Sequence, residues 1–279
     1  MSPRSHLYVP GNAPDRFGKA VASGAGAVIL DLEDAVAVSA KDDARATVAE
    51  WVRRPRTEAV EVWVRVNTGA RGTDDVRAVV GPGLTGICVP KVAAVSTLQL
   101  LHTLLSGLET AGGLPLGSIA VCPLIETAAG VVAAAEIAAG PRVRHLQLGE
   151  VDLAADLGVR PGPEGWELLH ARSTVVTASA AAGIAPPPGP VSTEFRDLAA
   201  FTAETERLAR LGFAGRVCIH PAQIRPVERV FTPTAEELAA ARDVLDRLAH
   251  AASGVAVGPD GRLLDEALAR QARRLLASA

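Results

Sequence analysis

Apolar residues in this chain come in short uninterrupted runs, and longer stretches of helical spacing separate these runs. The runs that predict strands are His6–Val9, Ala27–Leu32, Val60–Asn67, Gly86–Pro90, Ile119–Ile125, His145–Leu148, a weak one near Ile184–Ala185, and Gly215–Ile219. Stretches with helical spacing include Asp15–Ala22, Lys41–Arg53, Val95–Thr110, Ala128–Ala139, Trp166–Ala182 and Phe195–Leu211. Strands that are apolar throughout are buried on both faces, as in a parallel sheet. Eight such strand–helix units predict a (β/α)8 TIM barrel.

The seventh expected strand is the weakest of the eight, because Pro186, Pro187 and Pro188 follow it directly. Proline has no backbone N–H and is therefore rare inside a central strand. An open, doubly wound sheet is the alternative architecture. We expect the barrel to occupy residues 1–232 as one α/β domain.

The remaining segment, residues 233–279, lies outside the eight units. Thr234–His250 predicts a helix that begins with a capping box, because Glu237 follows Thr234 by three residues. A Gly-punctuated, hairpin-like turn and a final helix come next. This C-terminal helical extension is expected to act as a lid, as an oligomer arm, or as both.

Composition narrows the class of protein. Of the 279 residues, 48% are apolar and only 3% are aromatic, which indicates a large aliphatic core. The net charge is −3 and no long charged run is present, so neither a nucleic-acid partner nor a membrane partner is indicated. Cys88, Cys122 and Cys218 each lie in an apolar run, which is typical of reduced, buried thiols. Without an apolar leader or a membrane-length segment, we expect a cytoplasmic protein.

Polar residues gather at the ends of the expected strands. They are Asp31, Glu33 and Asp34 after the second run, Arg65 and Asn67 in the third, Lys91 after the fourth, Glu126 after the fifth, Glu150 and Asp152 after the sixth, and His220 and Gln223 after the eighth. In a barrel of this kind, active sites are built at the carboxyl ends of the strands. The set therefore predicts one converging site.

Glu126 and Asp152 are the best pair of metal ligands in this set. Each follows an apolar strand, and each supplies the hard oxygen donors that suit Mg²⁺ or Mn²⁺. The alternative is that both residues cap the helices that follow them.

Three further residues at the strand ends are candidates for chemistry. Arg65 lies between apolar residues and must be paired, either with a substrate oxygen or with the acids of the second strand. Lys91 could form a Schiff base or pair with Glu126 or Asp31. His220 could act as a general base, or it could orient the loop before Pro221.

The motifs at the strand ends resemble one family when they are taken together. "LYVPGN", "LDLEDAV", "VRVN", "VPK", "IET", "GxxDL" and "CIHPAQ" occur in order between Leu7 and about Pro233. The chain resembles the CitE-like branch of the HpcH/HpaI aldolase/citrate lyase superfamily. This resemblance implies a Mg²⁺-dependent barrel that handles a CoA or acyl-carrier thioester of a hydroxy-dicarboxylic acid. The implied reaction is retro-Claisen or retro-aldol cleavage of a C–C bond.

The resemblance also implies roles for individual residues. Glu126 and Asp152 match the ligands of the metal, which could also be Mn²⁺, and Asp31 and Glu33 match residues that hydrogen-bond the metal's waters. Arg65 matches an arginine that binds the substrate oxygen. The residues that match substrate and CoA contacts are Tyr8, Lys19, Arg65, Glu126, Ile219 and His220.

A C-terminal aspartate is part of the same resemblance. Asp265 matches a catalytic acid/base that acts at the thioester carbon, although it would equally serve as the N-cap of the final helix. Three positions depart from the usual pattern. Ala13 stands where many relatives have arginine, Val151 stands where many have the glutamate that precedes the aspartate ligand, and Ala267 stands where proline is usual.

These residues lead to a functional hypothesis with stated alternatives. We expect a stand-alone lyase that cleaves or forms malyl-CoA, citramalyl-CoA or a similar ester, with a CoA thioester and a keto acid as its small-molecule partners. The alternatives are a citrate lyase beta subunit that acts on a citryl-acyl-carrier thioester, a malyl-CoA-type thioesterase, and a non-enzymatic binding protein. By resemblance, the oligomer would be a homotrimer or a homohexamer.

Overall fold

The computed structural model describes residues 2–54, 59–251 and 254–278. Contacts between residues divide the chain into two compact units, Ser2–Glu228 and Arg229–Ala279. The first unit holds a parallel sheet and its helices, and the second holds two long helices and a short hairpin. The functional division into a catalytic domain, residues 1–232, and a lid or oligomer arm, residues 233–279, stays a prediction.

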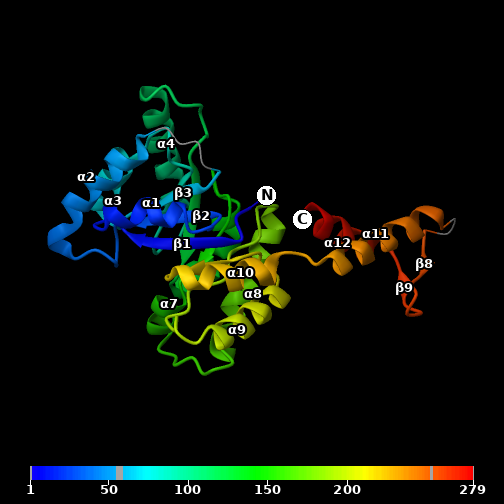
Figure 1. Cartoon of the computed structure of the whole chain (residues 1–279). Coiled ribbons are helices and arrows are strands. Elements are labelled where there is room, and N and C mark those ends of the chain that lie inside the picture. The colour runs from blue at the N-terminus through cyan, green and yellow to red at the C-terminus, as the bar shows by residue number, and fades with distance from the viewer. Residues whose placement is uncertain (1, 55–58, 252–253, 279) are drawn as a thin grey trace. The chain divides into compact units, whose positions relative to one another are not determined.

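The first unit is built on one parallel sheet of seven strands (Figure 1). The strands are β1 (Ser5–Pro10), β2 (Ala27–Asp31), β3 (Glu61–Arg65), β4 (Gly86–Val89), β5 (Ala120–Ile125), β6 (Gln147–Leu148) and β7 (Arg216–Cys218). Their spatial order is β6-β5-β4-β3-β2-β1-β7, and every neighbouring pair is parallel. The expectation of a parallel α/β sheet with strands in chain order from β1 to β6 is therefore confirmed.

The expected seventh strand, near Ile184–Ala185, does not form, so the prediction of eight strands was wrong. Pro186–Pro188 have no N–H groups to donate to a ladder. The segment makes scattered hydrogen bonds and one isolated parallel bridge, between Gly189 and Arg216. Ala185 N–H donates to Arg144 O at 3.0 Å, and Gly189 N–H donates to Gly215 O at 2.9 Å. The segment is thus bonded beside both edge strands, β6 and β7, but no continuous ladder closes the barrel.

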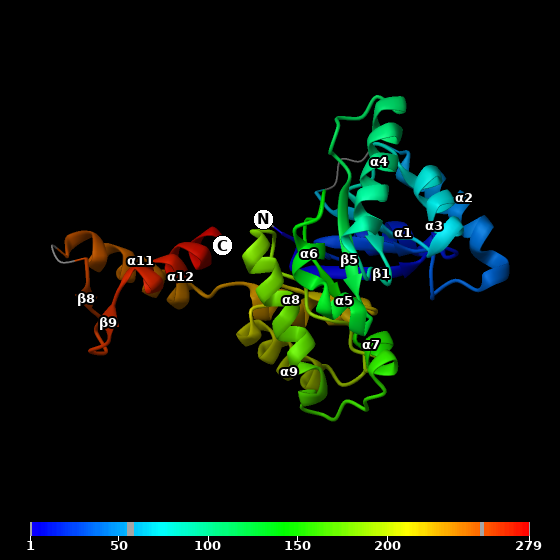
Figure 2. The ribbon, with the colours of Figure 1, turned by 180° about the vertical axis from the view of Figure 1, so that it is seen from behind.

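Helices connect the strands, as expected for an α/β unit. They are α1 (Pro14–Val21), α2 (Lys41–Val52), α3 (Gly69–Val79), α4 (Val95–Ala111), α5 (Ala128–Val132), α6 (Ala134–Ala138), α7 (Glu150–Leu157), α8 (Leu169–Ala182), α9 (Leu198–Leu211) and α10 (Ile224–Phe231), with short 3₁₀ turns η1 (Val38–Ala40), η2 (Trp166–Leu168) and η3 (Pro221–Gln223). Figures 1 and 2 show α2 beside α3 and α6 beside α8. The single helix expected over Ala128–Ala139 is interrupted at Ala133.

The side chains inside the curled sheet follow the two-residue period of the strands. One cluster contains Ala27, Ile29, Trp63, Cys88, Ala120, Cys122, Leu124 and Val217. Trp63 is the largest of these residues, and it is accommodated because Gly86 lies opposite: a Cβ at Gly86 would be 2.4 Å from the Trp63 ring. The three cysteines are free and buried, as the sequence predicted.

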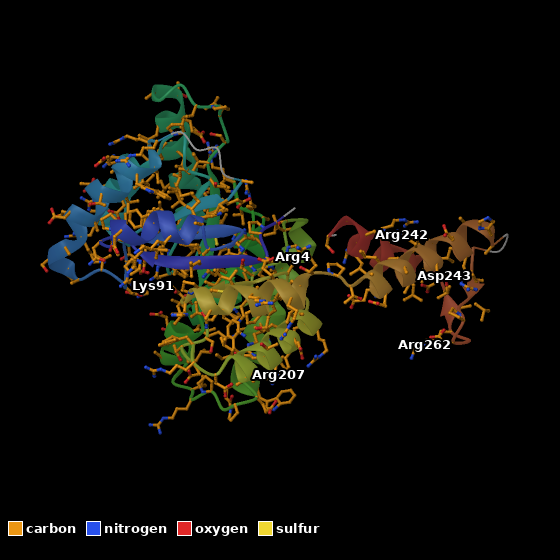
Figure 3. The ribbon with its side chains drawn as sticks, in the orientation of Figure 1. Arg4, Lys91, Arg207, Arg242, Asp243 and Arg262 are labelled. Atoms are coloured by element: carbon orange, nitrogen blue, oxygen red, sulfur yellow. The ribbon has the colours of Figure 1, made fainter. Side chains whose placement is uncertain are left out.

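The second unit consists of α11 (Ala235–His250), the antiparallel pair β8 (Ala256–Val257) and β9 (Leu263–Leu264), and α12 (Glu266–Ala277). Figure 3 shows Arg242 and Asp243 on α11 and Arg262 in the turn between the two strands. The predicted capping box is confirmed, because Thr234 Oγ1 accepts from Glu237 N–H at 3.1 Å and Glu237 Oε2 accepts from Thr234 N–H at 2.8 Å. In the described part of the chain, no helix has both the length and the apolarity needed to cross a membrane.

Two buried histidines lie at the amino ends of the strands. The rings of His6 and His145 are 5.4 Å apart, and the ring of His145 is 5.0 Å from that of Trp63. Burial lowers the pKa of His6 to about 4, against its hydrogen bond to Pro3 O, which raises the pKa. Burial, together with His6 and Arg144, lowers the pKa of His145 well below its usual range. Both rings are therefore neutral in the folded protein.

Protonation of His6 should destabilise the fold in acid. The unfolded chain takes up a proton as the pH falls through 6.5, whereas the folded chain does so only near 4, so stability is lost across that window. At pH 5 the loss is about 2 kcal/mol of unfolding free energy. Urea unfolding of wild type and His6→Gln at pH 7 and pH 5 checks this, with His170→Gln, an exposed histidine on α8, as the control. Equal pH dependence in all three proteins would contradict the assignment.

Candidate active site and metal centre

The two-residue period of the strands brings the predicted site residues to the mouth of the curled sheet. Asp31 follows Ala27 and Ile29 on the interior face of β2, and Arg65 follows Trp63 on β3. Asp31 and Arg65 are also direct partners in the β2–β3 register. Glu126 follows Leu124 by two residues just beyond the end of β5. The strand ends therefore converge, as the sequence predicted.

Arg65 holds the carboxylates of the "LDLEDAV" segment. Its Nε donates to Asp31 Oδ1 at 2.7 Å and its Nη2 donates to Asp31 Oδ2 at 2.6 Å, a bidentate pair. Its Nη1 lies 3.0 Å from Glu33 Oε2 and 3.7 Å from Asp34 Oδ2. Arg65 also lies over the ring of Tyr8, 4.9 Å from the ring centroid. The pairing of Arg65 with the acids of the second strand, which the sequence left open, is thus observed.

The loop that follows Asp31 is supported by a lysine that the sequence analysis did not consider. Lys41 Nζ donates to Leu32 O at 2.9 Å, to Glu33 O at 2.6 Å and to Asn67 Oδ1 at 2.6 Å. Asn67 in turn donates from Nδ2 to Leu32 O at 2.9 Å and to Asp75 Oδ2 at 2.7 Å. The backbone that presents Glu33 is therefore held from two sides.

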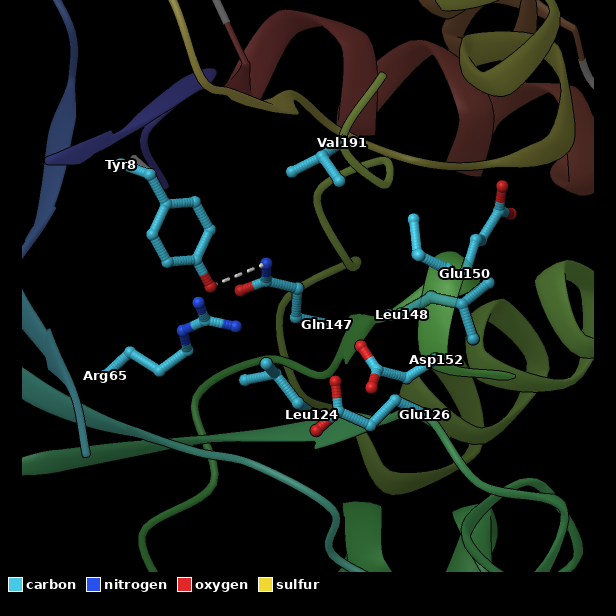
Figure 4. A pocket seen from close by; sticks show the side chains of 11 residues that line it. Tyr8, Arg65, Leu124, Glu126, Gln147, Leu148, Glu150, Asp152 and Val191 are labelled. Atoms are coloured by element: carbon cyan, nitrogen blue, oxygen red, sulfur yellow. Dashed lines mark hydrogen bonds between the residues drawn. The ribbon is translucent and has the colours of Figure 1, made fainter. Parts of the chain in front are cut away.

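Glu126 and Asp152 lie together in a pocket whose other walls include Tyr8, Arg65 and Val191. Figure 4 shows the two carboxylates pointing toward one another. Glu126 Oε1 accepts from the backbone N–H of Lys91 at 2.7 Å, and Lys91 Nζ lies 3.7 Å from Asp152 Oδ1. Lys91 therefore does pair at this site, although its ammonium group contacts Asp152 and not Glu126 or Asp31.

The electrostatics of this pocket fit a divalent cation. Burial, together with Glu33 and Asp152, raises the pKa of Glu126 to about 7, against the hydrogen bond from the Lys91 backbone and the charge of Arg65, which lower it. Burial also raises the pKa of Glu33 to about 7, and Glu33 Oε2 is buried without a hydrogen bond. A cation would stabilise the ionised form of both groups.

The protein itself would supply only a few of the ligands of such a cation. In the parts of the chain described, no group of three or more His, Cys, Asp or Glu side chains is arranged to hold a metal. Glu126 and Asp152 supply two carboxylates, which is the usual protein share for Mg²⁺ when water and substrate oxygens complete its shell. The residues present therefore fit Mg²⁺ better than a metal that needs an all-protein cage.

The helix-cap alternative for the metal pair is not observed. The N-cap of α5 is Thr127, whose Oγ1 accepts from Gly130 N–H at 3.0 Å, so Glu126 is free of that role. The N-cap of α7 is Gly149, and Asp152 lies in the first turn. Asp265 differs, because it is the N-cap of α12, with Oδ1 accepting from two backbone N–H groups.

Tyr8 belongs to the same pocket. Its hydroxyl oxygen accepts from Gln147 Nε2 at 3.2 Å (Figure 4). Burial raises the pKa of Tyr8 well above its usual range, against the effect of Arg65, so the phenol stays protonated. Tyr8, expected as a CoA contact, is thus placed beside Arg65 in the pocket.

Three expected CoA residues do not line this pocket. Lys19 is exposed on α1 and its Nζ lies 4.0 Å from Asp15. Ile219 is 41% exposed at the end of β7. His220 is the N-cap of η3, where Nδ1 accepts from Ala222 N–H at 3.1 Å and the ring stacks on Phe195 at 5.4 Å. The orienting role of His220 before Pro221 is therefore observed, and its role as a base stays a prediction.

Other pocket residues were missed by the sequence analysis. Gln147 carried a signal, because it is a polar residue inside the short apolar run of β6. Gly149 stands in the "GxxDL" motif, but the reason for a glycine there is visible only in three dimensions: a Cβ would be 2.5 Å from Glu126 Oε2. Val191 follows the proline-rich segment and has no periodic pattern around it.

Comparisons with known proteins agree with this geometry. A citrate lyase subunit beta from Leuconostoc mesenteroides subsp. cremoris is 35% identical over 98% of this chain and 92% of its own length. An L-malyl-CoA/beta-methylmalyl-CoA lyase from Cereibacter sphaeroides is 32% identical over 99% and 94% of the two chains.

A solved structure has the same fold over the whole chain. The CitE protein of Mycobacterium tuberculosis, in complex with magnesium, acetoacetate and coenzyme A, matches with a TM-score of 0.82 and 31% identity, over 100% of this chain and 98% of its own. Residues 4–221 match the HpcH/HpaI aldolase/citrate lyase family. With the parallel sheet and the carboxylates at its mouth, these matches show that the chain belongs to the HpcH/HpaI aldolase/citrate lyase family.

Proposed function

We propose that this chain is a Mg²⁺-dependent CoA-ester lyase that cleaves or forms a C–C bond in a hydroxy-dicarboxylyl-CoA such as malyl-CoA or citramalyl-CoA. The observation that carries the proposal is the pair Glu126 and Asp152 in a pocket beside Arg65. The named activity of the Cereibacter lyases and the ligands of the Mycobacterium protein support the same reaction class.

We assign parts in this reaction to residues in and beside the pocket. Glu126 and Asp152 would hold Mg²⁺, and Glu33 would hydrogen-bond its waters. When bound, Mg²⁺ supplies a Lewis acid for the oxygens of the keto acid. Arg65 is fixed by Asp31 through Nε and Nη2, and its Nη1 lies beside Glu33 and Asp34. In the reaction, its positive charge would stabilise a substrate oxygen on which negative charge develops.

Further roles rest on the resemblance alone. Asp265 would act as the acid/base at the thioester carbon, and Tyr8, Lys19, Ile219 and His220 would contact CoA or substrate. Assembly as a homotrimer or homohexamer is part of the same proposal. Asp265 is exposed, as an acid/base that meets substrate must be, and it lies in the C-terminal unit.

A citrate lyase beta subunit is the second candidate function. The 35% identity to the Leuconostoc subunit over nearly the whole chain favours it. Its substrate would be a thioester on an acyl carrier, so activity on free CoA esters separates the two candidates.

A substrate screen tests the proposal. Purified protein with Mg²⁺ is offered malyl-, citramalyl-, β-methylmalyl- and hydroxymethylglutaryl-CoA, and keto acid and free thiol are followed separately. A lyase releases keto acid without free thiol, whereas a thioesterase releases thiol without keto acid. Turnover only of a citryl-acyl-carrier substrate would favour the second candidate. If the purified protein bound neither Mg²⁺ nor any of these thioesters, the alternative of a non-enzymatic binding protein would be favoured.

Replacement of Glu126 should abolish Mg²⁺-dependent turnover and leave the fold intact. Glu126→Gln removes one of two metal ligands, and it also removes a carboxylate whose pKa of about 7 shows that its charge is disfavoured by burial. The melting temperature without metal should therefore stay equal or rise. Turnover and melting are compared with Glu136→Gln, an exposed glutamate on α6. Wild-type turnover in Glu126→Gln would remove this residue from the metal site.

Replacement of Asp265 by Asn separates its two roles. Asparagine caps a helix as well as aspartate does, so α12 should keep its stability, but the carboxylate base is lost. We expect turnover to fall at least about 100-fold, the contribution of a general base. Asp197→Asn is the matched control, because Asp197 caps α9 through the same pattern of two backbone N–H groups. An unchanged rate for Asp265→Asn would make the residue purely structural.

A further inference from the structure

Glu150 lines the pocket but is bound away from its metal pair. Arg172 Nε donates to Glu150 Oε1 at 2.5 Å, and Arg172 Nη2 donates to Glu150 Oε2 at 2.7 Å. Both side chains are largely buried, at 6% and 13% exposure. Figure 4 shows the Glu150 side chain pointing away from Glu126 and Asp152. Its carboxylate is fully engaged and is therefore no candidate for a third ligand.

Arg172 is itself fixed by its surroundings. Its guanidinium packs on Gly165, where a Cβ would come within 3.0 Å of Nη1. Its Nη2 lies 3.6 Å from Glu204 Oε1, and Glu204 also binds the fully buried Arg216. Arg216 Nε donates to Pro190 O at 3.1 Å, the residue before the pocket wall Val191. The pair thus belongs to a buried network that spans α8, α9 and β7.

This network acts on the start of α7, which carries Asp152. Glu150 is the first residue of α7, and Asp152 is the third. The preceding Gly149 packs against the Glu126 side chain, with room for no Cβ. The Asp152 side chain is 40% exposed, and its one ion pair within the described residues is the 3.7 Å contact with Lys91. The position of Asp152 therefore depends on how the first turn of α7 is anchored.

We propose that Arg172 is a positioning residue for the metal site: by clamping Glu150, it fixes the first turn of α7 and so holds Asp152 opposite Glu126. This inference rests on the proposed function, because it concerns the affinity of the Glu126–Asp152 pair for Mg²⁺. Loss of the clamp should weaken Mg²⁺ binding by about tenfold or more, the usual effect of removing a group that orients a metal ligand.

The chain offers a matched control for a merely structural role. Arg142 binds Glu109 in the same bidentate way, with both contacts at 2.7 Å and side-chain exposures of 5% and 0%. This pair lies at the amino end of β5, where Arg142 Nη1 also donates to Ile119 O. Because the pocket is at the carboxyl end of the sheet, loss of the Arg142 pair costs stability without touching α7.

Calorimetric titration with Mg²⁺ alone tests the inference on the full-length protein. Wild type, Arg172→Met, Arg172→Lys, Glu150→Gln and Arg142→Met are compared at one pH, and melting curves show which variants are folded. We expect a dissociation constant for Mg²⁺ that is at least about tenfold higher in Arg172→Met and higher in Glu150→Gln. Arg172→Lys should be intermediate, because lysine keeps the charge without the bidentate fork. Arg142→Met should bind Mg²⁺ as wild type does.

Other outcomes can be told apart by which variants fold and which of them bind Mg²⁺. If Arg172→Met does not fold, the milder Glu150→Gln decides, since it keeps the size of the side chain. Wild-type affinity in the folded clamp variants shows that α7 needs no anchor there. An equal loss in Arg142→Met assigns the effect to general destabilisation. If wild type itself binds no Mg²⁺, the proposed function fails first and the inference falls with it.

Discussion

The bidentate ion pair between Asp31 and Arg65 is the interaction on which the mouth of the sheet depends. The two residues are register partners on adjacent strands, so the pair forms as soon as β2 and β3 align. Desolvating two charges is costly, and a buried ion pair seldom stabilises a fold more than apolar residues would. Here the pair has a second effect, because the same guanidinium lies 3.0 Å from Glu33 and 3.7 Å from Asp34. One arginine thus allows three carboxylates to follow a buried strand.

The same strand geometry that aligns this pair also sorts the interior into layers. Apolar residues around Trp63 fill the centre, and the next interior position is polar on three strands, with Asp31 on β2, Arg65 on β3 and Glu126 after β5. A slip of one residue in β3 would turn Arg65 outward and leave Asp31 buried without a counter-charge. The site and the core are therefore specified by one register, which is why the polar residues of different strands meet at a single level.

The convergence of the site residues could be predicted from the sequence, because it follows from the topology of a parallel sheet. Asp31, Arg65 and Glu126 follow apolar runs, and the carboxyl ends of parallel strands lie at one edge, so their convergence follows from topology. The three prolines after Ala185 indicated that the strand expected near Ile184 was weak. The hydrogen bonds that this segment makes instead could not be predicted from the sequence. Lys41 and Arg172 act across the fold through contacts between distant segments, and no local pattern reveals such partners.

The carboxylates around the pocket fall into two groups, according to how their charge is balanced within the protein. Asp31 and Glu150 are each bound bidentately by a largely buried arginine, so their charge is balanced inside the protein. Glu126 accepts one backbone N–H, and in the described chain no ion pair to it is present; its pKa of about 7 records that imbalance. Asp152 faces only the half-exposed Lys91 among the described residues. The fold thus balances Asp31 and Glu150 with arginines, whereas Asp152 has the longer contact with Lys91 and Glu126 has no ion pair among the described residues. Two facing carboxylates with so little compensation suit a divalent cation.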